Sequence, residues 1–287
     1  MKKIFKTAVN LMACAMITVA TLGLSACEDI KNLDLTLSLY NATDKVFYDE
    51  AELSVELYRH LAPKTVDAIR DLADKGYYDG AIFYQETNYS SQIMVGDLKL
   101  DENGKPVQNL IDGKLPSEII GAEFTANGTT GSDLLAAEGY IGLWRSYYAS
   151  DNSYKTSSSA RNSGTGTWFI PTSAITSYDG YFCIFAKYDK TNETNNTAIN
   201  ALKAVFSNSE NYTEYVIFYT GDYEAGLTFN AVKKTDWNEN YDAEAKTYND
   251  TAVFVAEGNQ LVYYNYKTVK IPNVSDGKCY AQIKSVK

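Results

Sequence analysis

The most constraining feature of the sequence is a strict apolar and polar alternation that is followed at once by a helix signal. Within residues 51–58 the apolar side chains fall on every second position, which is the period of a half-buried β-strand. Pro63 then stands where helices begin, and residues 64–75 carry an apolar stripe at helical spacing that ends before Gly76. The chain therefore has to place an amphipathic helix directly after a half-buried strand.

Most of the remaining sequence also has the pattern of strands. Short apolar runs between turn residues predict them at residues 33–39, 81–84, 93–95, 141–144, 168–170, 181–188, 215–219, 227–232, 252–256, 261–266 and 278–286. A second helix is predicted over residues 197–206, and residues 236–250 are expected to form a polar loop. The sequence thus predicts a mainly β protein with two helices.

The first residues look like a targeting segment and not like part of the fold. Three lysines precede an apolar run over residues 8–24, and the run ends in Leu-Ser-Ala before Cys27. This ending resembles the bacterial lipobox, which implies cleavage before Cys27 and lipid attachment to its thiol. The alternative is an uncleaved membrane anchor, although the run is near the lower limit of about 20 apolar residues. We expect a signal peptide (residues 1–26), a lipidated cysteine with its tether (residues 27–46) and one domain (residues 47–287).

This leader predicts an exported lipoprotein that is held to a membrane on the extracytoplasmic side, at the cell surface or in the periplasm. A diacyl anchor suffices for stable attachment, whereas a single chain does not. The leader holds three of the 26 Lys and Arg residues and none of the 36 Asp and Glu residues, so the mature part has a net charge of −13. Such an acidic surface repels phosphate backbones, so nucleic acid is not an expected partner.

Two cysteines remain after the leader and the lipidation site, namely Cys183 and Cys279. Outside the cytoplasm they can form a disulfide. Two separate buried thiols are an equally good interpretation, because the sequence does not give the distance that a bridge requires.

The order of several motifs resembles the cyclophilin-type peptidyl-prolyl cis-trans isomerase family. The most specific stretch is Val55-Glu-Leu-Tyr-Arg-His-Leu-Ala-Pro-Lys-Thr-Val66, followed by Asp74-Lys-Gly-Tyr-Tyr-Asp-Gly80. Weaker matches follow in the family's order: Met94-Val-Gly-Asp97, Ala122-Glu-Phe124, Gly166-Thr-Trp-Phe-Ile170, Tyr178-Asp-Gly180 and Ile184-Phe-Ala-Lys187. The resemblance spans residues 50–206, and residues 280–286 resemble a closing strand. It implies a closed eight-stranded antiparallel barrel with two capping helices. Residues 207–270 have no clear counterpart and are expected to form a β-rich insertion or extension.

The resemblance also implies a chemistry and a site. Cyclophilins rotate X–Pro peptide bonds, against a barrier of about 18–20 kcal/mol, without a cofactor. The family's catalytic arginine is replaced here by Gln85, which donates only a neutral hydrogen bond, and charge-assisted bonds are about twice as strong. The residues that match the family's substrate pocket, with one residue inserted before Gly96, are Phe83, Ser91, Gln92, Met94, Phe169, Tyr178 and Phe182. We therefore expect weak or lost isomerase activity, on proline-containing segments of exported proteins.

Two alternatives remain open. If the insertion shifts the match, Arg145 reaches the site in place of Gln85. The second alternative is a barrel without catalysis that binds peptides or a surface protein partner. An aromatic loop with Trp144, Tyr147, Tyr148 and Tyr154 motivates it, because Tyr and Trp are favoured contact residues, although ordinary packing at the rim explains the loop as well.

The sequence offers little support for metal chemistry. His60 is the one histidine and is expected in a solvated turn, so a zinc site is not predicted. The acidic residues Asp236, Glu239, Asp242 and Glu244 lack the spacing of a calcium loop, and a solvated loop explains them better.

Overall fold

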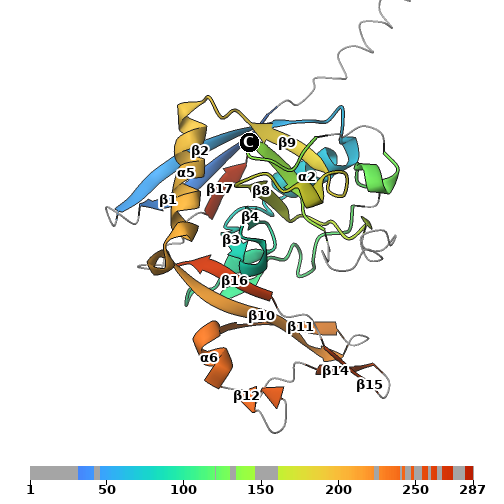
Figure 1. The fold of residues 1–287 in the computed structure, drawn as a ribbon, viewed down its shortest axis with the longest axis vertical. Helices are drawn as coiled ribbons and strands as arrows, with labels where there is room; N and C mark the ends of the chain where they lie inside the picture. Colours follow the sequence, from blue (N-terminus) through green and yellow to red (C-terminus); the bar gives the residue numbers. More distant parts are fainter. Residues whose placement is uncertain are drawn as a thin grey trace, which may run out of the picture. The chain divides into compact units, whose positions relative to one another are not determined.

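The computed structural model describes residues 32–41, 46–119, 121–129, 134–145, 161–222, 226–239, 241–242, 247–248, 254–257, 260–263, 267–273 and 282–286 (Figure 1). The predicted signal peptide, Cys27 and Cys279 lie outside these residues. Within them, no helix is both long and apolar enough to cross a membrane. The first strand begins at Asn32, so the predicted tether over residues 27–46 already contains part of the fold.

One large antiparallel sheet organises the described part of the chain. Its strands follow one another in the order β11-β10-β16-β3-β4-β8-β7-β9-β2-β1-β17. Their bounds in chain order are β1 Asn32–Asn41, β2 Val46–Leu57, β3 Phe83–Glu86, β4 Gln92–Val95, β7 Tyr140–Leu143, β8 Trp168–Pro171, β9 Ile184–Tyr188, β10 Tyr212–Asp222, β11 Gly226–Lys233, β16 Lys267–Pro272 and β17 Gln282–Val286. The stretch from β3 to β17 is an uninterrupted row of eight strands, in agreement with the mainly β fold that the sequence predicts. A pairing of β3 with β17, which would close the expected barrel, is not among the described pairings, so closure stays a prediction.

Smaller elements complete the fold. Three separate two-stranded sheets pair β5 (Leu98–Leu100) with β6 (Pro106–Gln108), β12 (Tyr241–Asp242) with β13 (Thr247–Tyr248), and β14 (Phe254–Glu257) with β15 (Gln260–Tyr263). The described helices are α2 (Pro63–Asp74), α5 (Glu193–Ser207) and α6 (Lys234–Glu239), with 3-10 turns η1 (Thr87–Tyr89), η2 (Thr125–Asn127), η3 (Thr176–Tyr178) and η4 (Ser209–Asn211).

Helix α2 forms where the sequence predicts it, and a buried carboxylate from a distant segment caps its start. Pro63 occupies the first turn, where no backbone donor is needed, and the buried stripe includes Val66, Ile69 and Leu72. Glu123 accepts hydrogen bonds from the backbone nitrogens of Lys64 (2.8 Å) and Thr65 (3.2 Å) and from the Thr65 hydroxyl (2.8 Å). The glutamate that matches a family motif therefore serves the first turn of this helix.

Helix α5 is longer than the predicted residues 197–206, because its first turn is polar. Asn192 caps this turn by accepting from the backbone nitrogens of Thr194 (2.9 Å) and Asn195 (3.1 Å). Asn195 in turn accepts from the backbone nitrogen of Ser54 in β2 at 2.9 Å. This buried side chain thus ties the helix to the strand that it covers (Figure 1).

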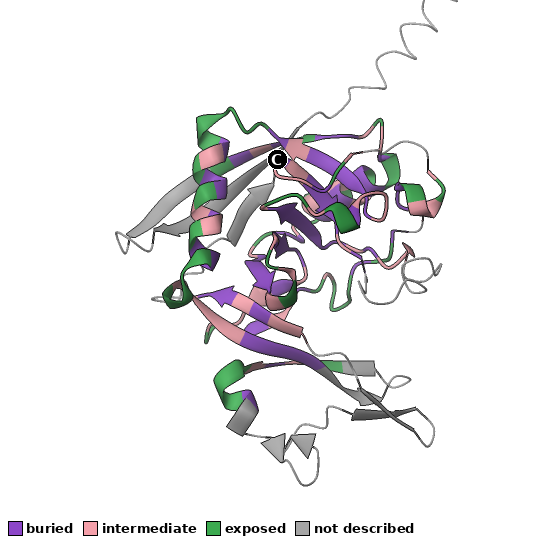
Figure 2. Ribbon diagram, viewed as in Figure 1, coloured by how far each residue is buried: buried purple, intermediate pink, exposed green. Residues whose placement is uncertain are grey.

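Three apolar clusters lie on the sheet, and the smallest joins β10 to α6 through Phe218 and Trp237. The first joins α2 and α5 to strand side chains such as Val55, Phe83 and Trp168. The second includes Tyr84, Met94 and Phe169. Figure 2 shows the short strands β3, β4 and β8 buried along their length, as expected for strands that are covered on both faces.

Three strands of the extension, residues 207–270, belong to the main sheet, namely β10, β11 and β16. Strand β16 pairs with β3 through Val269 opposite Glu86 and Lys270 opposite Gln85, and β10 and β11 continue the sheet beyond it. The sequence did not predict β16, because its apolar alternation is short and ends in a proline.

The expectation of a polar loop over residues 236–250 is wrong at its start. Helix α6 begins at Lys234, and its Trp237 packs on Phe218 of β10 with ring centroids 4.8 Å apart. This aromatic contact fixes a helix in a segment that is otherwise polar, and no hydrophobic periodicity indicated it.

Candidate functional site

Gln85 stands at the end of β3 with both halves of its amide engaged inside the protein. Its Nε2 donates to the backbone oxygens of Ser90 (2.9 Å) and Gln92 (3.3 Å). Its Oε1 accepts from Lys270 Nζ at 3.2 Å, and the residue is 5 % exposed. The donor that the resemblance matches to the family's arginine is therefore occupied by the protein's own carbonyl groups.

The sheet register separates the predicted pocket residues into two groups. Tyr84 lies opposite Met94, and Met94 lies opposite Phe169, so these side chains share one face of the sheet. Neighbouring residues of a strand point to opposite faces, which places Gln85 on the side of Phe83. The structure thus gathers Met94, Phe169, Tyr178 and Phe182 in the second apolar cluster and leaves Phe83 in the first.

An aromatic cluster fills the place where the resemblance implies an open pocket. We use this name for Tyr89, Trp144, Phe169, Tyr178 and Phe182. The indole of Trp144 stacks on Phe182 with centroids 5.4 Å apart and meets Tyr89 at 5.4 Å and Phe169 at 6.1 Å. Phe169 is 0 % exposed, so the floor of the implied pocket is covered.

Gly142 makes room for this arrangement. It lies opposite Phe169 in the pairing of β7 with β8. A Cβ atom at this position would overlap the Phe169 ring and come within 3.1 Å of Ile184 Cδ1. The glycine therefore lets the phenylalanine ring lie close against the neighbouring strand.

The remaining predicted pocket residues are Ser91 and Gln92, which lie where β4 begins. Ser91 is half-buried, whereas Gln92 is 0 % exposed. Neither polar atom of the Gln92 side chain finds a hydrogen-bond partner among the residues that the structure describes, an arrangement that destabilises the folded state. Gln92 lies opposite Pro171, a residue that has no backbone N–H group to offer.

Arg145 does reach the aromatic cluster, as the alternative match proposes, but as a buried residue. Its guanidinium carbon lies 5.0 Å from the ring centroid of Phe182 and 5.1 Å from that of Phe124. Its Nε donates to the backbone oxygen of Tyr181 at 2.6 Å, and the residue is 2 % exposed. Tyr147, Tyr148 and Tyr154 of the aromatic loop lie outside the described residues.

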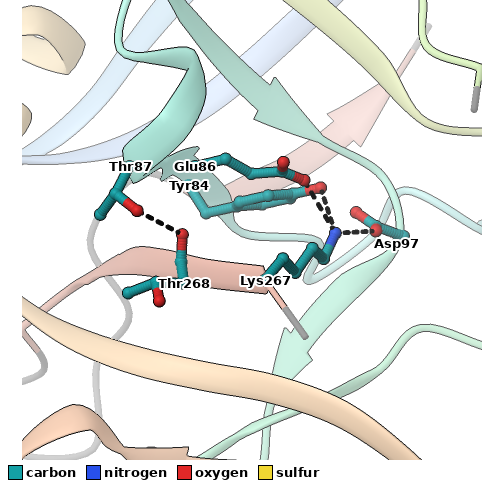
Figure 3. Close-up of polar contacts among 6 residues, drawn as sticks. All are labelled: Tyr84, Glu86, Thr87, Asp97, Lys267 and Thr268. Atoms are coloured by element: carbon teal, nitrogen blue, oxygen red, sulfur yellow. Dashed lines mark hydrogen bonds and ion pairs between the residues drawn. The ribbon is translucent and has the colours of Figure 1, made fainter. Parts of the chain in front are cut away.

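A charged junction joins β16 of the extension to β3 and to Asp97, which follows β4 (Figure 3). Lys267 Nζ lies 3.1 Å from Glu86 Oε1, 3.3 Å from Asp97 Oδ2 and 3.4 Å from the Tyr84 hydroxyl. Burial, followed by the charge of Asp97, raises the pKa of Tyr84 well above its usual value, so this hydroxyl stays neutral. Sequence patterns gave no sign of this junction, because β16 was not predicted.

Other predicted residues take no part in a described site. Cys183 is buried, its thiol donates to the Thr65 hydroxyl at 3.4 Å, and it forms no disulfide among the described residues. Its pairing with Cys279, which lies outside them, stays a prediction. His60 is exposed. Within the described residues no group of three or more His, Cys, Asp or Glu side chains converges to hold a metal ion, and Glu244 lies outside them.

Comparisons with known proteins point to one family. The family described as cyclophilin type peptidyl-prolyl cis-trans isomerase/CLD matches residues 43–221. No curated protein matches the chain. Among solved structures, a cyclophilin-type peptidyl-prolyl cis-trans isomerase from Cryptosporidium parvum is similar at 20 % identity over 58 % of this chain and 83 % of its own, with a TM-score of 0.35. The same protein in the presence of the dipeptide Ala-Pro is similar at 20 % identity over 57 % and 83 %, with a TM-score of 0.33. Because the family match covers more than half of its residues, the chain belongs to the cyclophilin-type peptidyl-prolyl cis-trans isomerase family.

Proposed function

We propose that the chain is an exported lipoprotein, anchored through lipid on Cys27, whose cyclophilin-type domain has weak or no isomerase activity. The family's reaction needs a donor aimed at the proline nitrogen and an apolar pocket for the ring. With the family goes the expectation of a closed eight-stranded barrel, which a pairing of β3 with β17 would complete.

The main observation that supports weak or lost activity is that the aromatic cluster is closed. A proline ring has to rest on Phe169, and this residue is 0 % exposed beneath Trp144. Any substrate must first displace the indole from its contacts with Phe182 and Tyr89. Such aromatic pairs contribute about 0.5–1.5 kcal/mol each beyond their buried area, so opening the site reduces the gain from binding.

The second observation that supports weak or lost activity is that the side-chain amide of Gln85 is already hydrogen-bonded within the protein. Rotation of an X–Pro bond is accelerated when a donor stabilises the twisted amide, and preorganised electrostatic stabilisation often contributes more to catalysis than any other effect. The Gln85 amide is neutral and its N–H groups already serve Ser90 and Gln92. It would have to give up these bonds before it contacts a substrate.

A proline-isomerisation assay on the purified full chain tests this proposal. We expect turnover far below that of an ordinary cyclophilin, and a measurable increase in binding of a proline-containing tetrapeptide for Trp144→Ala. The matched control is Trp237→Ala, which removes the same side chain from α6. Turnover in the range of an ordinary cyclophilin that Phe169→Ala abolishes would refute the loss of activity.

The lipid anchor has its own test. Metabolic labelling with a radioactive fatty acid should mark the wild-type protein and leave Cys27→Ala unlabelled, with Cys14→Ala as the matched control. Equal labelling of the wild type and Cys27→Ala would remove the anchor from the proposal.

A second candidate function is binding of a protein partner without catalysis. The buried amide of Gln92, which has no partner within the described part of the chain, favours it, because a peptide backbone that entered the opened site would satisfy this group. Tight tetrapeptide binding by the wild-type chain without any turnover would select this second function.

A further inference from the structure

Gln92 differs from the other carboxamides that are buried in the described part of the chain. Gln85, Asn109 and Asn195 are also buried, and the side chain of each forms at least two hydrogen bonds with the backbone. Gln92 is 0 % exposed, and neither its Nε2 nor its Oε1 atom has a partner among the same residues. A buried polar group without a hydrogen bond destabilises the folded state, so its presence needs an explanation.

The strand register directs this side chain to the face of the aromatic cluster. Strand β4 lies between β3 and β8 in the sheet (Figure 1). In its pairing with β8, Gln92 lies opposite Pro171, and Met94 lies opposite Phe169. Side chains two positions apart on a strand point to the same face, so Gln92 shares the face of Met94 and Phe169. Pro171 has no N–H group and so offers no backbone donor to the Gln92 amide.

The residues around the start of β4 keep part of their surface in solvent. The η1 turn ends at Tyr89, shortly before β4, and the Tyr89 ring packs on Trp144. Tyr89, Ser91 and Trp144 are half-buried, whereas the residues of β4 itself are buried. A ligand that displaces the Tyr89 and Trp144 rings therefore approaches both Phe169 and the start of β4, where Gln92 lies.

The chemistry of a carboxamide determines which ligand would satisfy it. A glutamine side chain offers N–H donors and a carbonyl acceptor, so a matching ligand presents an acceptor and a donor side by side. In an extended peptide, the N–H and C=O groups of one residue point to the same side of the strand and meet this requirement. A proline has no N–H group, and it would leave the Oε1 atom of Gln92 without a donor.

We propose that Gln92 binds the backbone of an extended peptide at a residue other than proline, beside the aromatic cluster. The amide that destabilises the free protein gains its hydrogen bonds only in the complex. The site thus prefers a residue with a free N–H group, whereas the family's reaction requires one without it. This inference rests on the second candidate function, peptide binding without catalysis, and it adds the class of peptide that is bound.

Calorimetric titration of the purified full chain with N-methylated tetrapeptides tests the preference. The parent peptide is acetyl-Ala-Ala-Phe-Ala-amide, and each of its derivatives carries one N-methyl group, which removes an N–H group as a proline does. At one position, N-methylation should weaken binding to the wild type and to Trp144→Ala by at least about fivefold, the loss of one hydrogen bond, and proline there should do the same. Gln92→Met, which keeps the length of the side chain, should lose this sensitivity.

Thermal unfolding of the free protein gives a second readout that needs no ligand. Gln92→Met removes an unsatisfied amide and should raise the midpoint by about 2–4 °C. The matched control Asn109→Leu should lower it, because the Asn109 amide donates to the backbone oxygens of Tyr77 (2.9 Å) and Gly96 (2.7 Å).

The two readouts decide the inference separately from the function on which it rests. A Gln92→Met variant no more stable than the wild type would overturn the inference, because the amide would then be satisfied within the free protein. Equal sensitivity to N-methylation in Gln92→Met and the wild type would also overturn it and would leave peptide binding standing. Absence of binding by the wild type and by Trp144→Ala would refute both the inference and the second candidate function.

Discussion

Replacing Glu123 by alanine should destabilise the protein strongly, although the residue lies far from helix α2 in the sequence. The carboxylate is 5 % exposed and accepts three hydrogen bonds, from the backbone nitrogens of Lys64 and Thr65 and from the Thr65 hydroxyl. Each hydrogen bond to a charged group makes a net contribution of about 1.5–3 kcal/mol to stability, and loss of a helix cap alone costs about 0.5–2 kcal/mol. Burying the charge offsets part of this gain.

Together these effects should make Glu123→Ala lower the free energy of unfolding by about 3 kcal/mol. For a domain of about 250 residues, each kcal/mol shifts the midpoint of thermal unfolding by about 2–4 °C, so the midpoint should fall by about 6–12 °C. Glu123→Gln keeps an acceptor and should lose roughly half as much, since neutral hydrogen bonds are about half as strong.

Urea unfolding followed by tryptophan fluorescence measures the effect, with Glu118→Ala as the matched control because Glu118 is exposed. A loss below about 1 kcal/mol for Glu123→Ala would refute the reasoning, because it would mean that water replaces the carboxylate at the start of α2.

Three further predictions concern other parts of the fold. Burial raises the pKa of Cys183 to about 12, so the folded protein keeps a proton that the unfolded chain releases near pH 9; the free energy of unfolding should fall as the pH rises from 9 to 12, and Cys183→Ala should lessen this fall in urea titrations. Gly142→Ala should cost about 1–3 kcal/mol, because its methyl group would overlap Phe169; equal stability in thermal melts would contradict the packing. Lys267→Met should cost about 1–2 kcal/mol, since it leaves the carboxylates of Glu86 and Asp97 facing each other, and the double variant with Glu86→Gln should recover part of the loss.

Sequence patterns predicted the elements whose ends are specified by neighbouring residues. Helix α2 appears within one residue of its predicted bounds, because Pro63, a regular apolar stripe and Gly76 specify both of its ends. The start of α5 was missed because its first turn depends on the cap by Asn192 and on the contact of Asn195 with β2, neither of which shows in a hydrophobic pattern.

The candidate site was predicted in its parts but not in its arrangement. The family match selected Met94, Phe169, Tyr178 and Phe182, which the structure brings into one cluster. Trp144 was expected at the end of a strand and in the aromatic loop that follows it, and only the tertiary packing places this indole against Phe169. Lys270 had no signal at all, because a contact across 185 positions depends on a strand pairing that single-sequence periodicity does not encode.

The pairing of β1 with β17 has a consequence for the order of events during folding. Leu35 lies opposite Val286, and Gln85 lies opposite Lys270. Strands β1 and β3 therefore pair with strands that are synthesised much later. Such distant pairings incur a loop-closure cost before any contact offsets it, and they slow folding. The sheet therefore cannot be completed until nearly the whole polypeptide has emerged. For a chain with the proposed export signal, this delay favours passage in an unfolded state, with assembly of the sheet only on the far side of the membrane.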